Sequence, residues 1–336
     1  MRKEVNIIEK RGKHGIRFII FWGCFLFLSQ ALIGLRAEDK YPRYYFSFSY
    51  MQGKMAVGDL NTYLVTFNNN DLFKYIRENN PTWGEVQGNI LPLSGKYAIW
   101  DIELLMEINP KIRIGFSTHS PQGKKKLDRL VYIMREPGAT TGITYTIYSG
   151  YMNYSPLEFS VSYNLWERKK ISLSLGVGTG IYRATISRHI YMDIYTSNES
   201  GSKRSPIRRI LESGRPYLPA LGGFGNVSVK YAVSSRLSFI AEAKARYGKI
   251  SNFKGSEFSL YIDDNGNIGY NEYKGKLWFY PTNIDYWIGT SYSQLEISPV
   301  KPDMVWLSES ILENIRKANL NLTGLSFGIG LKIRLF

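Results

Sequence analysis

The chain contains very little cysteine or histidine and, after its first segment, no long apolar run. Its 336 residues include one cysteine, Cys24, and three histidines. A single cysteine excludes an internal disulfide and a metal site built from several cysteines. After residue 37, no run reaches the roughly 18 apolar residues that a membrane-spanning helix needs. If the chain is exported, it is therefore soluble or it crosses a membrane with β-strands.

The first 37 residues have the pattern of a secretory signal peptide. Six basic residues precede or enter an apolar stretch at 18–28, and Ala31 and Ala37 end two candidate cleavage sites. A basic segment, a short apolar segment and a small residue before the cut are the parts of such a signal. We expect a signal peptide at 1–37 and a mature chain at 38–336. The mature chain stays basic, because the signal carries seven of the Lys and Arg residues and two of the Asp and Glu residues.

What the mature chain does contain is aromatic residues and alternation with a period of two. From Leu325 to Leu335 every second residue is large and apolar, and the residues between them are small or basic. This period places the two sets on opposite faces of a β-strand. Seven other stretches alternate in the same way, at about 44–51, 97–108, 111–120, 157–165, 171–181, 221–232 and 237–247. The sequence therefore predicts eight strands.

The connections between these stretches fall into two classes. Opposed residues of an antiparallel pair of strands must point to the same face of the sheet. This rule gives three-residue turns after the second, fourth and sixth stretches, at 109–111, 167–169 and 233–235. The other connections are long loops, at about 53–96, 121–141, 190–216 and 253–317. Short turns at one rim and long loops at the other are typical of an all-β, antiparallel transmembrane up-and-down barrel.

Two details qualify this barrel. Within the first long loop, apolar residues at helical spacing predict a short helix over 60–67 with Asp59 as its N-cap. In the last loop, 276–280 and 286–293 also alternate, so that a barrel of ten strands is the alternative to eight.

The chain ends in an amphipathic stretch, 319–336, whose final residue is Phe336. This resembles the closing strand of bacterial outer-membrane β-barrels, and the mature chain as a whole is similar in architecture to the small OmpX-, OmpW- and opacity-protein-like barrels. The resemblance implies insertion in the outer membrane of a Gram-negative cell envelope, contact with lipid and lipopolysaccharide, and recognition of 319–336 by the barrel-assembly machinery. We expect a monomer with no cofactor, no metal and no nucleic-acid partner. Phe336 is out of phase with the apolar set, which predicts a place at the periplasmic rim.

The polar set of the strands carries charges of both signs, which a barrel would direct into its lumen. An eight-stranded barrel is just wide enough for side chains to fill it, and charges buried there must pair. We expect an ion-paired, closed interior in which Glu107 faces Arg113; the glycine-rich stretch 171–181 keeps a narrow channel as the alternative. The candidate residues of this lumen charge network are Asp101, Glu103, Glu107, Arg113, Glu158, Lys230, Glu242, Lys244, Arg246, Lys332 and Arg334.

Two other groups of residues point to contacts outside the barrel wall. Basic residues of the second and third long loops suit lipopolysaccharide phosphates; they are Lys124, Lys125, Lys126, Arg129, Lys203, Arg204, Arg208 and Arg209. Two histidines, His119 and His189, lie near the outer strand ends, but neither has the serine spacing of the lipid A deacylase barrels. We therefore expect a non-enzymatic protein that presents surface loops for interaction or envelope integrity. A porin-like small-solute channel is the alternative, and a lipid A-modifying enzyme is a lesser one.

Overall fold

The computed structural model describes most of the mature chain. The described residues are 41–68, 73–74, 76–77, 84–120, 122–136, 138–198, 201–214, 220–262, 266–285, 290–301 and 315–335. The expected signal peptide at 1–37 and the expected rim position of Phe336 lie outside these ranges. Among the described residues, no helix is long and apolar enough to cross a membrane.

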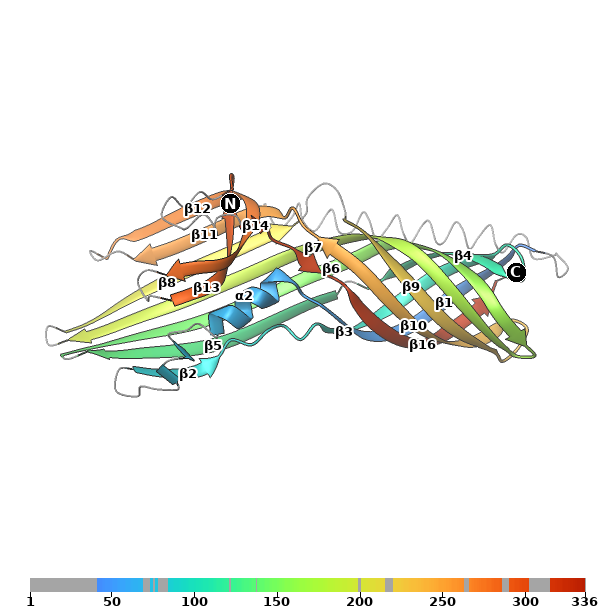
Figure 1. The fold of residues 1–336 in the computed structure, drawn as a ribbon, viewed down its shortest axis with the longest axis horizontal. Helices are drawn as coiled ribbons and strands as arrows, with labels where there is room; N and C mark the ends of the chain where they lie inside the picture. Colours follow the sequence, from blue (N-terminus) through green and yellow to red (C-terminus); the bar gives the residue numbers. More distant parts are fainter. Residues whose placement is uncertain are drawn as a thin grey trace.

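Eight strands close into an antiparallel ring, as the sequence predicts (Figure 1). In order around the ring they are β1 (Arg43–Met55), β3 (Lys96–Glu107), β4 (Ile112–His119), β6 (Ala139–Arg168), β7 (Ile171–Asn198), β9 (Ala220–Ala232), β10 (Leu237–Ile250) and β16 (Gly324–Arg334). The last strand closes on the first, with Phe46 opposite Ile333. Each strand pairs with the ring strands that precede and follow it, so that the barrel is of the up-and-down type.

The alternative with ten strands in the barrel is wrong. β12 (Ile268–Asp285) and β13 (Thr290–Ser298) do pair with each other, but they lie outside the ring. The other long-strand neighbour of β12 is β11 (Lys254–Ile262), which is not a barrel strand either. The ring is complete without them, because β10, which precedes β12 and β13 in the chain, pairs directly with β16, which follows them.

One of the three predicted turns is confirmed, and two hairpins differ by two residues in register. Ile108 N donates to Ile112 O at 3.0 Å, which encloses the predicted turn 109–111. In the third hairpin Ala232 lies opposite Ser238, and not opposite Arg236. Val233 N donates to Leu237 O at 2.9 Å, so the turn again encloses three residues, 234–236, and Ser234 Oγ accepts from the backbone inside it. In the second hairpin the pairing is irregular near the turn. Beyond this irregularity its register also differs from the predicted register by two residues. A shift of two leaves every side chain on its predicted face.

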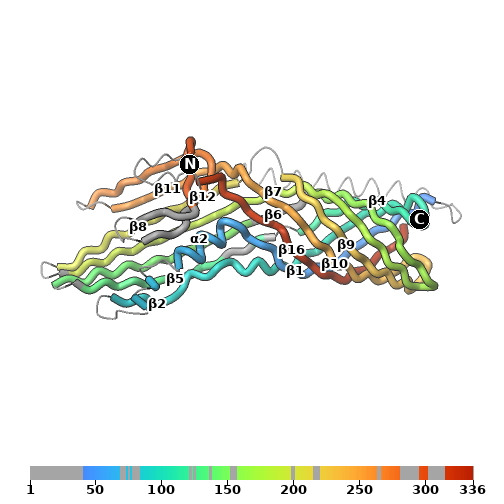
Figure 2. Tube along the Cα trace, viewed as in Figure 1, coloured from blue at the N-terminus to red at the C-terminus, as the bar shows by residue number. Residues whose placement is uncertain are grey.

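β6 and β7 run through the ring and far beyond it (Figure 2). Within the ring β6 pairs with β4 and β7 pairs with β9. Beyond the ring β6 pairs with β5 (Gln122–Glu136) and β7 pairs with β8 (Gly201–Gly214). The sheet continues from β8 through β11 and β12 to β13, and from β5 to β2 (Gly84–Asn89). We call this extension, together with α2 (Asp59–Asn68), the outer module.

The long loops of the sequence prediction are therefore largely strands. The ranges 121–141, 190–216 and 253–317 contain β5, β8, β11, β12 and β13, and the range 53–96 contains α2 and β2. The prediction failed here because strands of the outer module alternate less evenly than those of the ring. Their apolar face packs on a protein core, which accepts polar residues such as Arg188 and Ser149 within it.

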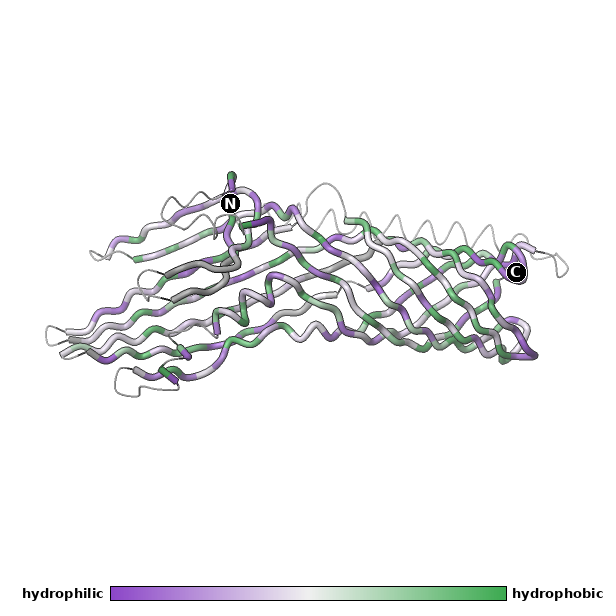
Figure 3. Tube along the Cα trace, in the orientation of Figure 1, coloured by the Kyte–Doolittle hydropathy of each residue, from purple (hydrophilic) through white to green (hydrophobic). Residues whose placement is uncertain are grey.

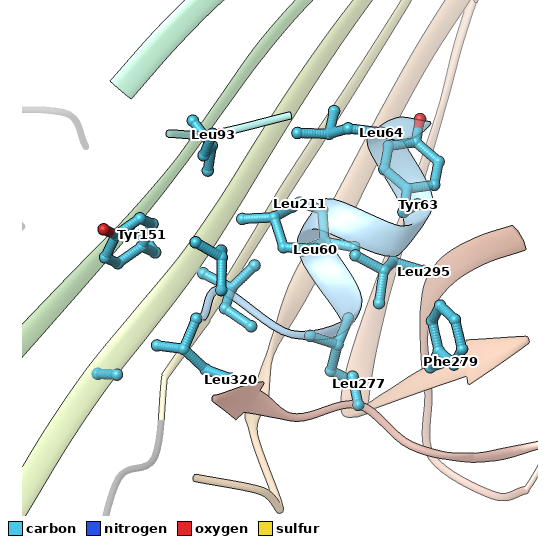
Figure 4. Close-up of a cluster of buried hydrophobic side chains, with 14 of the residues drawn as sticks. Leu60, Tyr63, Leu64, Leu93, Tyr151, Leu211, Leu277, Phe279, Leu295 and Leu320 are labelled. Atoms are coloured by element: carbon cyan, nitrogen blue, oxygen red, sulfur yellow. The ribbon is translucent and has the colours of Figure 1, made fainter. Parts of the chain in front are cut away.

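The concave face of the outer module holds α2 and the main apolar core (Figure 4). The helix predicted over 60–67 is confirmed, and its apolar residues are buried because they recur at helical spacing on one side. They pack against side chains of the sheet, including Leu211, Leu277 and Leu295. The helix thus packs against the concave face of a curved sheet. It follows the end of β1 in the chain and is therefore connected directly to the barrel.

The expected N-cap role of Asp59 is wrong. The carbonyl of Gly58 accepts the first helical hydrogen bonds, from Asn61 N at 3.0 Å and Thr62 N at 3.2 Å. The Asp59 carboxylate instead accepts from Arg316 through two nitrogens, each at 2.6 Å, and from the backbone and side chain of Asn319. Arg316 belongs to β14 (Arg316–Lys317), which is followed by β15 (Leu320–Asn321). The side chain therefore ties the start of the helix to the segment that enters the last barrel strand.

Hydrophobic and hydrophilic residues alternate along the strands of the ring (Figure 3), and their exposure distinguishes an apolar outside from a polar inside. The outward set is exposed although it is large and hydrophobic: Trp100, Phe116, Val161, Leu175, Phe239 and Ile329 each leave between 41% and 71% of their surface open. Serines and charged residues on the same strands are buried instead. A barrel that folds in water has the opposite arrangement. This distribution is that of a transmembrane barrel.

Candidate functional site

The half of the lumen next to the outer module is filled by a buried cluster of ion pairs around Glu158, which we call the outer cluster. Lys244 Nζ lies 3.1 Å from Asp101 Oδ2 and 3.1 Å from Glu158 Oε2. Arg246 donates to the other oxygen of Glu158 at 3.0 Å, and the Tyr182 hydroxyl lies 3.3 Å from the same oxygen. Glu158 itself has no exposed surface. These side chains come from β3, β6, β7 and β10, so that the cluster links strands on different sides of the ring.

A second cluster lies at the rim with the short turns. Arg113 Nε donates to Glu107 Oε2 at 3.0 Å, and these residues are directly opposite each other in the ladder, as expected from the sequence. Arg113 also donates to Ser174 Oγ on β7 at 3.0 Å. Arg43, which the sequence analysis did not include, lies 3.9 Å from Glu107. Its position at the start of β1, opposite Glu107 in the ladder, is the signal that would have identified it.

The other residues of the predicted network lie between or beside these clusters. Glu242 accepts from Asn226 Nδ2 at 2.8 Å, and Glu103 accepts from Ser160 at 3.4 Å. Lys332 lies over the ring of Tyr45 at 4.5 Å. The half-buried members of the network are Glu103, Lys230, Glu242 and Arg334. The predicted charges are thus brought together as two clusters with polar contacts between them.

Aromatic side chains fill the space left by the glycines of β7. A Cβ added at Gly180 of β7 would lie 2.9 Å from the ring of Tyr182, and one added at Gly222 of the neighbouring β9 would lie 2.6 Å from it. Tyr182 is fully buried and belongs to an apolar layer with Met51, Tyr97 and Leu322, which continues into the core of the outer module. The alternative of a narrow channel relies on the room beside these glycines. The structure shows a ring occupying that room.

The outer module has a buried charge cluster of its own, which the sequence analysis missed. Arg188 donates to Glu257 Oε1 at 3.2 Å and to the carbonyl of Leu295 at 2.8 Å. Its guanidinium also lies over the ring of Tyr63 at 5.0 Å, which joins α2 to the sheet. Burial raises the pKa of the Tyr63 hydroxyl above its ordinary value. Arg188 precedes the predicted loop 190–216, and Glu257 lies in the predicted loop 253–317, so no local pattern pairs them.

The basic residues predicted to contact phosphate are distributed along the outer module. Three of them pair with carboxylates: Lys126 with Asp128, Arg204 with Asp193, and Arg209 with Glu257. The Arg204 contact lowers the pKa of Asp193 below its ordinary value. The side chains of Lys124 and Lys125 lie outside the described part of the chain, and Lys203 has a contact of its own. Two remain, Arg129 and Arg208, and both line one surface groove.

The two histidines lie far apart in different parts of the fold. His119 is buried at the end of β4, where its Nδ1 lies 3.0 Å from the carbonyl of Ser120. His189 lies in the outer module, with Nε2 3.4 Å from a carboxylate oxygen of Glu212. The hydrogen-bonding partners of both imidazoles are thus a carbonyl and a carboxylate, and not serine hydroxyls. Within the described ranges, no group of three His, Cys, Asp or Glu side chains is arranged to hold a metal ion.

Comparisons with known proteins found similarity in structure but not in sequence. No protein-family model matches the chain, and no curated protein matches it significantly. Outer membrane protein OprG from Pseudomonas aeruginosa aligns at 7% identity over 88% of this chain and 96% of its own, with a TM-score of 0.29. Outer membrane protease OmpT from Escherichia coli aligns at 11% identity over 88% and 99%, with a TM-score of 0.27.

A major outer membrane protein from Thermus thermophilus is similar to the same degree, at 9% identity over 87% of this chain and 99% of its own, with a TM-score of 0.27. At these scores the alignments add no argument of their own. The fold assignment follows from the closed ring, its apolar exterior and its charged interior. The chain has the fold of the outer-membrane β-barrels.

Proposed function

We propose that this protein is a non-enzymatic outer-membrane barrel whose lumen is closed and whose function resides in the outer module. The observation that carries the proposal is the full burial of Glu158 between Lys244 and Arg246. Ion-paired side chains that fill the interior of a narrow barrel leave little room for solute or water. The outer module has an apolar core and a large exposed sheet face, which suit a rigid surface for interaction or envelope integrity.

The orientation follows from the two rims. Barrels of this class have short periplasmic turns and longer extracellular segments. The start of β1 and the end of β16 lie at the rim with the short turns, and the outer module lies at the other (Figure 1). The proposal therefore puts the outer module on the cell surface, where envelope polysaccharides and external partners are accessible to it.

Electrical recordings separate this proposal from the small-solute channel. The full chain, refolded and inserted in a planar lipid bilayer, is expected to give no steady ion current, because the ion pairs of the outer cluster and the Tyr182 layer fill the lumen. A porin of known conductance, inserted under the same conditions, is the control. Discrete ohmic current steps from this protein would overturn the closed-lumen proposal in favour of the channel.

Lipid contact is tested by a charge on the exterior of the ring. Val161 lies in the middle of the outward apolar set of β6, so Val161→Arg is expected to lower the free energy of unfolding in lipid vesicles by about 2–4 kcal/mol. The matched control is Leu127→Arg on β5, an exposed apolar position of the outer module, where surface substitutions change stability by about 0.5 kcal/mol. Chemical denaturation measures both. Equal effects of the two variants would mean that the ring is not embedded in lipid.

A further inference from the structure

One row of side chains crosses the exposed face of the outer module on five neighbouring strands. Arg129 of β5 lies opposite Thr146 of β6, which lies opposite Tyr191 of β7. Tyr191 lies opposite Arg208 of β8, and Arg208 lies opposite Leu260 of β11. These residues line one groove of about 570 Å³. The sheet register thus unites two arginines from separate stretches of the sequence in one site.

The two arginines differ from most other basic residues of the outer module. Among the residues that the structure describes, neither forms a salt bridge, whereas Arg204 and Arg209 pair with carboxylates. Both arginines are exposed. The one acidic residue lining the groove, Asp193, is held by two nitrogens of Arg204, with Arg204 Nε at 2.8 Å from Oδ1. The groove therefore keeps a net positive charge that is available to a ligand.

The groove also has features that suit sugar rings. The guanidinium of Arg208 lies 5.0 Å from the centre of the Tyr191 ring, which holds the aromatic face in place. Tyrosine combines an apolar ring face with a polar hydroxyl, which matches a pyranose with its C–H face and hydroxyl edge. The hydroxyls of Thr144 and Thr146 lie beside it as hydrogen-bonding groups. Arg129 and Arg208 are three strands apart, which spaces their Cα atoms roughly 14 Å from each other.

We propose that this groove binds an anionic polysaccharide, with Arg129 and Arg208 on its acidic groups and Tyr191 under a sugar ring between them. Paired guanidinium groups bind carboxylate, sulfate or phosphate through charge-assisted hydrogen bonds. Tyr191 lies nine residues beyond Tyr182, the last β7 residue that pairs with β9 in the ring, which places the groove roughly 30 Å from the barrel at about 3.3 Å per residue. That height fits a surface polysaccharide and not the phosphates of lipid A at the membrane. The inference rests on the proposed function for the exposure of the outer module to the cell surface.

The binding test uses the full chain in detergent micelles at one fixed ionic strength. Dextran sulfate is the anionic polysaccharide probe, uncharged dextran supplies sugar without charge, and polyglutamate supplies charge without sugar. Arg129→Ala and Arg208→Ala are each expected to weaken dextran sulfate binding about tenfold, the value of one charge-assisted contact. Tyr191→Ala is expected to weaken it about fivefold. The control is Arg135→Ala, also on β5, where the arginine pairs with Glu85 at 3.5 Å outside the groove.

Three results would overturn the inference. Equal loss in the Arg135 control and the groove variants would mean that general charge attraction binds the probe. Equal affinity for polyglutamate and dextran sulfate would mean that the sugar is not recognised. No binding of dextran sulfate by the native chain would mean that the groove is not a site. None of these results depends on a closed lumen, so failure here and failure of the conductance test are distinguishable.

Discussion

Replacing Glu158 with alanine is expected to lower the free energy of unfolding of the barrel by about 3–5 kcal/mol. The carboxylate has no exposed surface and contacts both Lys244 and Arg246. Its removal leaves these two cations buried, and among the described residues Asp101 is the carboxylate that still forms an ion pair with Lys244. Unpaired charge in a dry site costs far more than a surface pair contributes. Guanidinium titration in lipid vesicles, followed by tryptophan fluorescence, measures the change.

Two further variants make this result specific. Glu158→Gln keeps the shape and removes the charge, and it is expected to be destabilising as well. Glu167→Ala, at an exposed position near the turn-facing end of β6, is the control and is expected to change stability by less than about 1 kcal/mol. An unchanged denaturation midpoint for Glu158→Ala would show that the cluster around this residue is not what closes and stabilises the lumen.

Replacing Arg188 with alanine is expected to loosen the outer module while the barrel stays folded. The guanidinium is almost fully buried and joins Glu257 to α2 through the ring of Tyr63. Its loss leaves the Glu257 carboxylate buried with a weaker partner, Arg209 at 3.6 Å, at a cost of about 3–5 kcal/mol to the module. Limited proteolysis of the protein in vesicles is expected to cleave the module, whereas the heat-dependent shift in gel mobility that reports the folded barrel persists.

The double variant Arg188→Met with Glu257→Leu tests the physical cause. Replacing both members of a buried ion pair by apolar residues of similar size is often neutral, so protease resistance is expected to recover. Arg209→Ala, which removes the more exposed arginine of the cluster, is expected to have a small effect. Complete loss of the folded barrel in Arg188→Ala would contradict the division of the chain into a ring and an outer module that unfold separately.

The interior of the barrel could be predicted from the sequence because alternation is a local property. The inward position of Glu107, Arg113 and Glu158 depends only on whether a residue is odd or even within its strand. Two of the three hairpin registers differ from the prediction by two residues, and an error of two does not change the face. Eight strands, short turns and a charged lumen could therefore be predicted even though the exact pairing could not.

The outer module could not be predicted in this way. Residues 143–147 of β6 alternate between Ile, Thr and Tyr as the barrel strands do, but Tyr145 and Ile147 pack on α2 and its core instead of facing lipid. An alternating strand shows that its two faces differ, and it does not say whether lipid or protein covers the apolar one. The partner change of β6, from β4 to β5, is a tertiary event with no local signal.

The features of the candidate sites also divide into those that alternation predicts and those that it does not. Alternation along each strand was enough to assign the lumen charges and the outward apolar belt, since these depend on neighbours two residues apart. It was also enough to assign the closure of the last strand on the first, since this depends on matching faces. The sharing of Glu158 by two cations, the filling of the glycine space by Tyr182 and the alignment of Arg129 with Arg208 were decided only by the tertiary structure. Each of these depends on the register of several strands at once, and a strand sequence carries no information about the strands beyond its immediate neighbours.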